Sequence, residues 1–161
     1  MLRILIALTA LSLAPVCTPA QNDTGPGTDV AAIHKLMGRY TKAVDSLDVH
    51  ELSEIWSHAP EVSFIYPLGE EDGFEAIEKH VFEDVMGGMF STRDLQVLRT
   101  AVHVNGVVAW AEFHWIFHAT MQKDNSAVIT HGVETQIYRR ENGTWRLVHV
   151  HYSEDPKTAA Q

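Results

Sequence analysis

The amino-acid sequence predicts an α+β domain in which three N-terminal helices pack on one face of an antiparallel sheet. Up to residue 91, apolar side chains recur at three- and four-residue spacing, which is the period of a helix, and beyond it they alternate with period two. Two pairs, Asn105-Gly106 and Asn142-Gly143, separate the later segments and are strong hairpin signals. Helices followed by a strand meander are typical of the α+β class.

The helices are predicted from their apolar stripes and from the residues that flank them. The first begins at Thr28 or Asp29, either of which can cap a helix, and ends near Ser46. The segments expected after it are a helix at Val49–Trp56, a turn at Gly69–Gly73 and a helix from Phe74 to Gly87-Gly88.

The strands are predicted from runs that are rich in β-branched and aromatic residues. The first strand is short because Pro67 ends it, and four long strands follow it. The expected strands are Val62–Tyr66, Leu95–Val104, Val107–Thr120, Ala127–Arg140 and Trp145–Ser153.

The turns set the pairing register, and the register sets which face of the sheet each side chain takes. Pairing across Asn142-Gly143 places Gln136 opposite His149 and Glu134 opposite His151. The same face carries many apolar side chains and is expected to meet the helices. These apolar side chains are Leu98, Ala111, Phe113, Trp115, Phe117, Tyr138 and Leu147. A polar cluster among them predicts a pocket or a closed hydrogen-bonded network, because an unpartnered buried polar group costs roughly 1–3 kcal/mol.

The opposite, outer face of the sheet has no helix left to cover it. Its apolar residues are expected to be Ile116, Val133, Ile137, Val148 and Val150. A large uncovered apolar patch is typical of an association surface, so we expect the chain to form a homodimer or a larger ring. His114, His118 and His131 share this face, but their spacing matches no named metal motif and we expect no metal site.

Composition restricts the possible partners. The 161 residues carry 21 acidic and 12 basic side chains, a formal charge of −9. Binding to a nucleic acid needs clustered Lys and Arg, so a nucleic acid is not expected as a partner. The single Cys excludes an intramolecular disulfide and a Cys-based zinc site.

The first 20 residues have the pattern of a secretory signal peptide. Arg3 precedes an apolar run from Ile4 to Leu13, and small residues lie before a cleavage position near Ala20. The run is too short to span a bilayer, so no stable membrane span is expected. The pattern predicts a secreted or periplasmic protein, with residues 21–28 as a flexible lead-in to the folded domain.

A resemblance to a known family rests on four segments, which are Val102–Gly106, Glu134–Gln136, Tyr138–Arg140 and above all Asn142–Ser153. These segments resemble the nuclear transport factor 2-like superfamily, which includes SnoaL-like polyketide cyclases and ketosteroid isomerase. The likeness covers residues 29–156, leaving 157–161 as a tail, and is strongest to the association domain of calcium/calmodulin-dependent protein kinase II and its bacterial SnoaL-like relatives. The resemblance implies a cone-shaped fold with a pocket between helices and sheet, and assembly through the sheet surface.

Three functions agree with these observations. The first is a binding domain for a small, partly apolar molecule, and the second is a cofactor-free isomerase, dehydratase or cyclase. The third is a structural association hub. No cofactor is expected. The candidate acid–base residues are Glu134, His149 and His151, and the candidate ligand contacts are Tyr40, Trp56, Tyr66, Phe113, Trp115, Gln136 and Tyr138.

Overall fold

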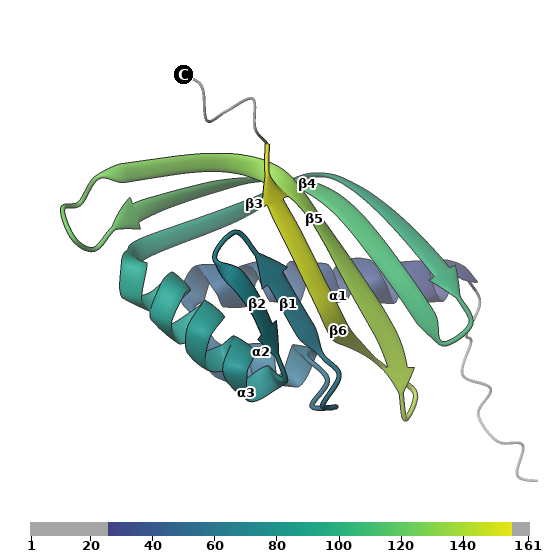
Figure 1. Cartoon of the computed structure of the whole chain (residues 1–161). Coiled ribbons are helices and arrows are strands. Elements are labelled where there is room, and N and C mark those ends of the chain that lie inside the picture. Colours follow the sequence, from purple (N-terminus) through teal and green to yellow (C-terminus); the bar gives the residue numbers. More distant parts are fainter. Residues whose placement is uncertain (1–25, 156–161) are drawn as a thin grey trace, which may run out of the picture.

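The computed structural model describes residues 26–155, shown in Figure 1. The predicted signal peptide, residues 21–25 of the lead-in and the tail lie outside this range. The helices are α1 (Pro26–Ser46), α2 (Val49–Ile55), α3 (Phe74–Ala76) and the π-helix η1 (Ile77–Gly87). The strands are β1 (Ser63–Tyr66), β2 (Gly69–Asp72), β3 (Phe90–Asn105), β4 (Val108–Met121), β5 (Ala127–Glu141) and β6 (Thr144–Glu154).

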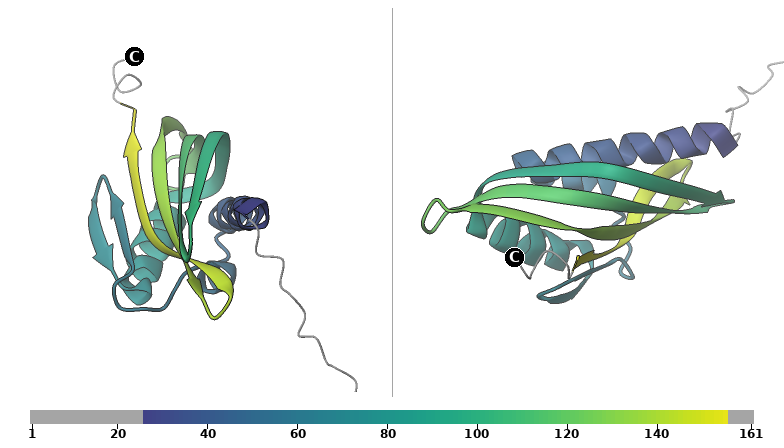
Figure 2. Two further views of the ribbon diagram at one scale, coloured as in Figure 1. Left: turned by 90° about the vertical axis from the view of Figure 1, so that its right-hand side faces the viewer. Right: turned by 90° about the horizontal axis from the view of Figure 1, so that it is seen from above.

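The six strands form one curved sheet in the order β2-β1-β6-β5-β4-β3. Neighbours pair antiparallel except β1, which runs parallel to β6. The sheet arches over α1 and η1, which lie on its concave side (Figures 1 and 2). The predicted α+β cone with its helices on one face is confirmed.

Helix α1 buries the apolar stripe that predicted it, including Ile33, Met37 and Tyr40. It begins at Pro26 rather than at Thr28 or Asp29, so residues 26–28 of the expected lead-in are helical. A proline suits the first turn of a helix because its φ is already helical and its missing N–H would have no partner there.

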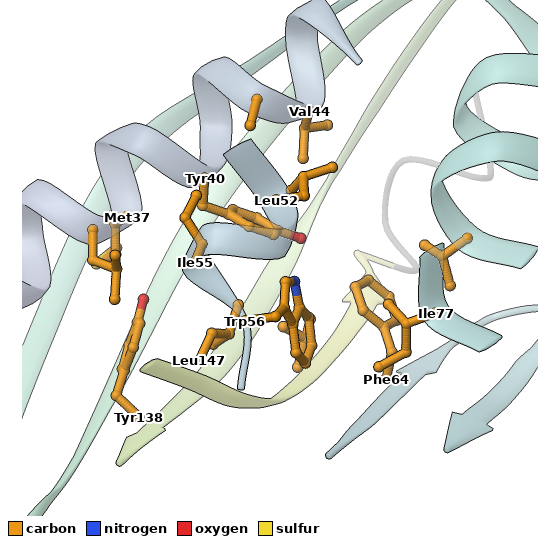
Figure 3. Close-up of a cluster of buried hydrophobic side chains, with 14 of the residues drawn as sticks. Met37, Tyr40, Val44, Leu52, Ile55, Trp56, Phe64, Ile77, Tyr138 and Leu147 are labelled. Carbon is orange, nitrogen blue, oxygen red and sulfur yellow. The ribbon is translucent and has the colours of Figure 1, made fainter. Parts of the chain in front are cut away.

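The core lies between these helices and the sheet (Figure 3). Trp56 is fully buried in it and contacts the rings of Phe64 and Phe74, with centroids 6.1 and 6.3 Å away. Figure 3 shows Tyr40 reaching from α1 across this layer, and Tyr138 rising from the sheet toward Met37.

The prediction of a turn at Gly69–Gly73 is wrong, because residues 69–72 form strand β2. It pairs with β1 in a hairpin whose tip is Pro67-Leu68. Acidic residues are uncommon in strands, so Glu70, Glu71 and Asp72 gave no period-two signal.

The register of β6 differs from the prediction in a way that changes the site. Tyr138 pairs with Leu147 as expected, but Ile137 then pairs with His149, so Val148 is an extra residue in a β-bulge. Beyond the bulge every side chain of β6 changes face. The predicted pairs Gln136–His149 and Glu134–His151 are therefore wrong, and Val150 and Tyr152 stand opposite Gln136 and Glu134 instead.

The other two hairpins are displaced by two residues from the predicted register. Phe113 pairs with Thr100 on one side and with Glu134 on the other, and a shift of two leaves the faces of these residues unchanged. A second bulge in β3 makes Leu98 the extra residue. Leu98, which we expected on the helix-facing side, is 62% exposed.

Gly132 permits close packing between β4, β5 and β6. It pairs with Trp115 on β4 and with Glu154 on β6. A Cβ at this position would lie 2.1 Å from the carbonyl oxygen of Ser153 and 2.4 Å from a carbon of the Trp115 ring. Backbone cannot move aside cheaply, so only glycine fits here.

We expect Gly132→Ala to lower the free energy of unfolding by about 3 kcal/mol, the upper part of the usual range for overpacking. The measurement is urea unfolding followed by circular dichroism. The matched control is Gly38→Ala in α1, where an added Cβ meets nothing within 4 Å and should stabilise the helix by roughly 1 kcal/mol. Equal stability of Gly132→Ala and wild type would show that the packing at β5 is looser than described.

Candidate functional site

A cavity of about 230 Å³ lies between the helices and the concave face of the sheet. Tyr40 and Val44 of α1, with Val85 and Met86 of η1, form its helical wall. The strands supply Trp115 and Phe117 from β4, Glu134 from β5 and Tyr152 from β6. Leu68, Met89 and Glu154 line it and are exposed, so they mark its opening.

Arg93 and Asp45 hold the helices in place around the cavity. The Arg93 guanidinium donates to the carbonyl oxygens of Val44 at 3.2 Å, Met86 at 3.0 Å and Phe90 at 2.6 Å. The Asp45 carboxylate accepts from the Leu95 amide at 2.7 Å. These contacts join α1, η1 and β3, each of which contributes lining residues to the cavity.

The polar part of the wall is a hydrogen-bonded row on β5. Side chains two apart along a strand share a face, so Glu134, Gln136 and Tyr138 follow one another. The Tyr138 hydroxyl donates to the Gln136 side-chain oxygen, and Gln136 Nε2 donates to Glu134 Oε1 at 2.6 Å. The Tyr40 hydroxyl forms a further hydrogen bond with the Glu134 carboxyl.

Glu134 is the group whose chemistry is most altered by the fold. Its side chain is only 3% exposed, and burial raises its pKa to about 8 against the ordinary 4.5. The hydrogen bonds from Gln136 and Tyr40 act in the opposite direction and lower its pKa. The carboxyl therefore exchanges a proton near neutral pH, which suits acid–base chemistry or the binding of a polar group.

Aromatic rings surround this carboxyl. The Tyr152 ring packs edge-on against Trp115 and Phe64, with centroids 5.8 and 6.0 Å away. Burial raises the pKa of Tyr152 and the pKa of Tyr40. Both phenols therefore stay neutral at physiological pH.

The structure brings together only some of the residues that the sequence proposed. Glu134, Tyr40 and Trp115 line the cavity, and Gln136 and Tyr138 stand behind Glu134 in its hydrogen-bonded row. The other three aromatic candidates, which belong to the core around the cavity, are Trp56, Tyr66 and Phe113. The contact of any of them with a ligand remains a prediction.

His149 and His151 lie on the outer face, because the β6 bulge turns them away from Glu134. His149 Nδ1 is 2.8 Å from the Ser63 hydroxyl, and burial lowers the pKa of His149. His151 is exposed. The predicted acid–base cluster of Glu134 with these two histidines is therefore wrong in its geometry.

Sequence reasoning missed several cavity residues. Tyr152 was not recognised, because an unbroken register would place it on the outer face and the bulge has no sequence signal. Phe64 and Leu68 belong to a strand and hairpin that the meander did not include, and Val85 and Met86 were recognised only as part of a helix.

Within residues 26–155, no group of three or more His, Cys, Asp or Glu side chains could hold a metal ion. No helix in that range is long and apolar enough to cross a membrane.

Replacing Glu134 by Gln is expected to change how stability depends on pH. Between pH 4.5 and about 8 the folded protein holds a proton on Glu134 that the unfolded chain has lost. Rising pH therefore destabilises the wild type through this group. At roughly 1.4 kcal/mol per pKa unit, the variant should gain about 5 kcal/mol over the wild type between pH 4 and pH 9.

The measurement is urea unfolding at each pH. Glu112→Gln, an exposed position on β4, controls for the loss of one negative charge. A difference between wild type and Glu134→Gln that stays constant over this range would contradict the buried, proton-holding carboxyl.

Comparison with known proteins places this chain in a family. Residues 33–156 match the SnoaL-like domain. The structure is similar to a nuclear transport factor 2-like superfamily protein from Salmonella enterica, with 35% identity and a TM-score of 0.80 over 84% of this chain and 97% of that chain. A search of curated proteins found no match.

Two more distant structures share the fold. One is hexachlorocyclohexane dehydrochlorinase LinA-type3 from Novosphingobium barchaimii, at 16% identity and a TM-score of 0.71, over 80% of this chain and 87% of that chain. The other is a candidate dehydratase from Streptomyces avermitilis, at 19% identity and a TM-score of 0.73, over 82% of this chain and 99% of that chain. The domain match and the Salmonella relative together show that the chain belongs to the SnoaL-like domain family of the nuclear transport factor 2-like superfamily.

Proposed function

We propose that the cavity binds one small, mostly apolar molecule, with Glu134 as its polar anchor. An apolar protein cavity of roughly 150 Å³ holds benzene. By that scale a cavity of about 230 Å³ accommodates about nine non-hydrogen atoms, which is a substituted single ring.

The observation that carries this proposal is the carboxyl of Glu134 in an apolar cavity. Burial of this group destabilises the fold above pH 4.5, whereas a glutamine could keep the same hydrogen bonds without that cost. A structural role alone does not need an ionisable group here. In addition, the Trp115 indole N–H is buried and has no hydrogen-bond partner within residues 26–155, and an acceptor on a bound molecule is one way to satisfy it.

Cofactor-independent acid–base catalysis is the second candidate function. A carboxyl that exchanges its proton near pH 8 in a mostly apolar cavity is suited to remove a proton from a bound molecule. Relatives of the same fold are named as a dehydrochlorinase and a candidate dehydratase. In this function Glu134 would act without His149 and His151, which face the other side of the sheet.

We further propose export and self-association. Export rests on the signal-peptide pattern of residues 1–20, which predicts a secreted or periplasmic protein. Self-association rests on the outer sheet face, where Leu98, Trp110, Ile129 and Val133 are exposed. The resemblance to a kinase association domain supports the same surface, although Val150, expected in this patch, is buried on the other side.

Filling the cavity should abolish binding of small aromatic molecules. Thr130 lines the cavity and is half-buried, so Thr130→Phe places a ring inside it. We expect 4-ethylphenol and tert-butylbenzene to shift resonances of cavity residues in NMR titrations of the wild type. Their affinity should fall at least about tenfold in the variant, since the space they need is lost.

The matched control is Ile129→Phe, which adds a ring to the neighbouring residue of the same strand, on the exposed outer face. This variant should bind 4-ethylphenol and tert-butylbenzene with the same affinity as the wild type. Binding that survives Thr130→Phe, or no binding by the wild type, would contradict a ligand site in this cavity.

The outer face should hold two copies of the chain together. We expect the wild type to elute as a dimer or larger ring in size-exclusion chromatography with light scattering. Val133→Lys should shift it to the monomer mass, because a charge at the centre of an apolar contact is desolvated without a partner. The control is Leu68→Lys, an exposed apolar residue at the cavity mouth, which should leave the mass unchanged. A monomeric wild type at micromolar concentration would refute the proposal.

A further inference from the structure

The charged side chains that line the cavity, among the residues that the structure describes, are all of one sign. Among its lining residues in the described part of the chain, the only charged side chains are Glu134 at the inner wall and Glu154 at the mouth. Arg93 lies on β3 near the mouth but does not line the cavity, and its guanidinium is occupied by three backbone carbonyls. The formal charge of the whole chain is −9. An anionic ligand would therefore find no cationic side chain among the lining residues to bind its charge.

The walls of the cavity are unusually rich in rings. Six lining side chains are aromatic, namely Tyr40, Phe64, Phe90, Trp115, Phe117 and Tyr152. Several of them stand edge-on to one another, as Tyr152 does to both Trp115 and Phe64. A ring that lines a cavity can offer its face to a ligand, and the face of an aromatic ring attracts a cation.

The hydrogen-bonded row on β5 is directed toward a negative charge at Glu134. Tyr138 donates to Gln136, and Gln136 donates to Glu134, so each donor points toward the carboxyl. Tyr40 adds a hydrogen bond from the other side, and both bonds favour the ionised carboxylate. Burial opposes ionisation, and within residues 26–155 no cationic side chain is in place to compensate it. The hydrogen bonds thus favour a negative charge on Glu134, but no described residue of the cavity wall provides a positive charge to pair with it.

On the basis of the binding function above, we propose that the ligand is an organic cation, an amine or quaternary ammonium group carried on an apolar body. Its charge would lie against Glu134 and the surrounding rings, and its apolar part would fill the remainder of the cavity. Glu154 at the mouth would favour entry of a cation over an anion.

Binding of such a ligand should be linked to a proton on Glu134. The other titratable groups that face Glu134 are Tyr40 from α1, Tyr138 from β5 and Tyr152 from β6, and burial raises the pKa of all three phenols. They stay neutral up to pH 9, so Glu134 is the group that changes charge. A bound cation favours the ionised carboxyl and therefore releases a proton below pH 8.

The test compares phenyltrimethylammonium with tert-butylbenzene, which has the same shape with carbon in place of the charged nitrogen. Neither probe titrates. We expect calorimetry to show that affinity for the cation rises roughly tenfold per pH unit between pH 6 and pH 7.5 and levels off above pH 8.5, with a proton released into the buffer. Affinity for tert-butylbenzene should not rise with pH.

Glu134→Gln separates the charge from the shape of the site. At pH 9 this variant should bind phenyltrimethylammonium at least about tenfold more weakly, with no pH dependence, and should bind tert-butylbenzene as tightly as the wild type. Proton release by the wild type, measured in two buffers of different ionisation enthalpy, tests the linkage even if the variant does not fold.

The outcomes distinguish this inference from the binding function beneath it. Binding of tert-butylbenzene alone, or cation binding that is independent of pH and of Glu134, overturns the cationic ligand and leaves the cavity as a binding site. If neither probe binds and Thr130→Phe does not change the binding of any small aromatic molecule, the cationic ligand and the binding function of the cavity are both contradicted.

Discussion

The burial of one carboxyl group determines how the interior of this protein is built. Glu134 lies on the concave face of the sheet, where neighbouring positions are apolar, and an isolated charge there is costly. Two donors reach it from different parts of the chain, Gln136 from its own strand and Tyr40 from α1. The position of α1 is therefore part of the site, and Arg93 and Asp45 hold that helix to β3 and η1.

A single extra residue in β6 decides which side chains surround this carboxyl. With Val148 in a bulge, Val150 and Tyr152 face inward, and His149 and His151 face outward. In an unbroken register two imidazoles would stand beside Glu134 and could supply the positive charge that the cavity now lacks. The bulge replaces them with an apolar side chain and a neutral phenol. Gly132 makes the same region compatible with the Trp115 ring, so two backbone features shape the aromatic wall.

Much of the fold could be predicted from period and turns, and the limits of that prediction have definite physical reasons. The spacing of apolar residues predicted the helices and the long strands. Two predicted hairpin registers were displaced by two residues, but they still put Phe113, Trp115 and Glu134 on the correct face. A displacement of one residue, as at Val148, exchanges the faces, and nothing in the local sequence indicates it. Tyr40, Trp115 and Glu134 were therefore found, whereas Tyr152 was missed and two histidines were misplaced. Strand β2 was missed because acidic residues gave no alternating pattern.

The same strand carries two surfaces that do not interfere with each other. Along β5, Glu134 points into the cavity and its neighbour Val133 points to the exposed outer face, because successive side chains alternate. The cavity opens beside Leu68, Met89 and Glu154, away from the apolar side chains on the outer face. Since the two surfaces share only backbone, a substitution on one face should leave the other face intact, and the proposed binding and the proposed assembly can therefore be tested separately.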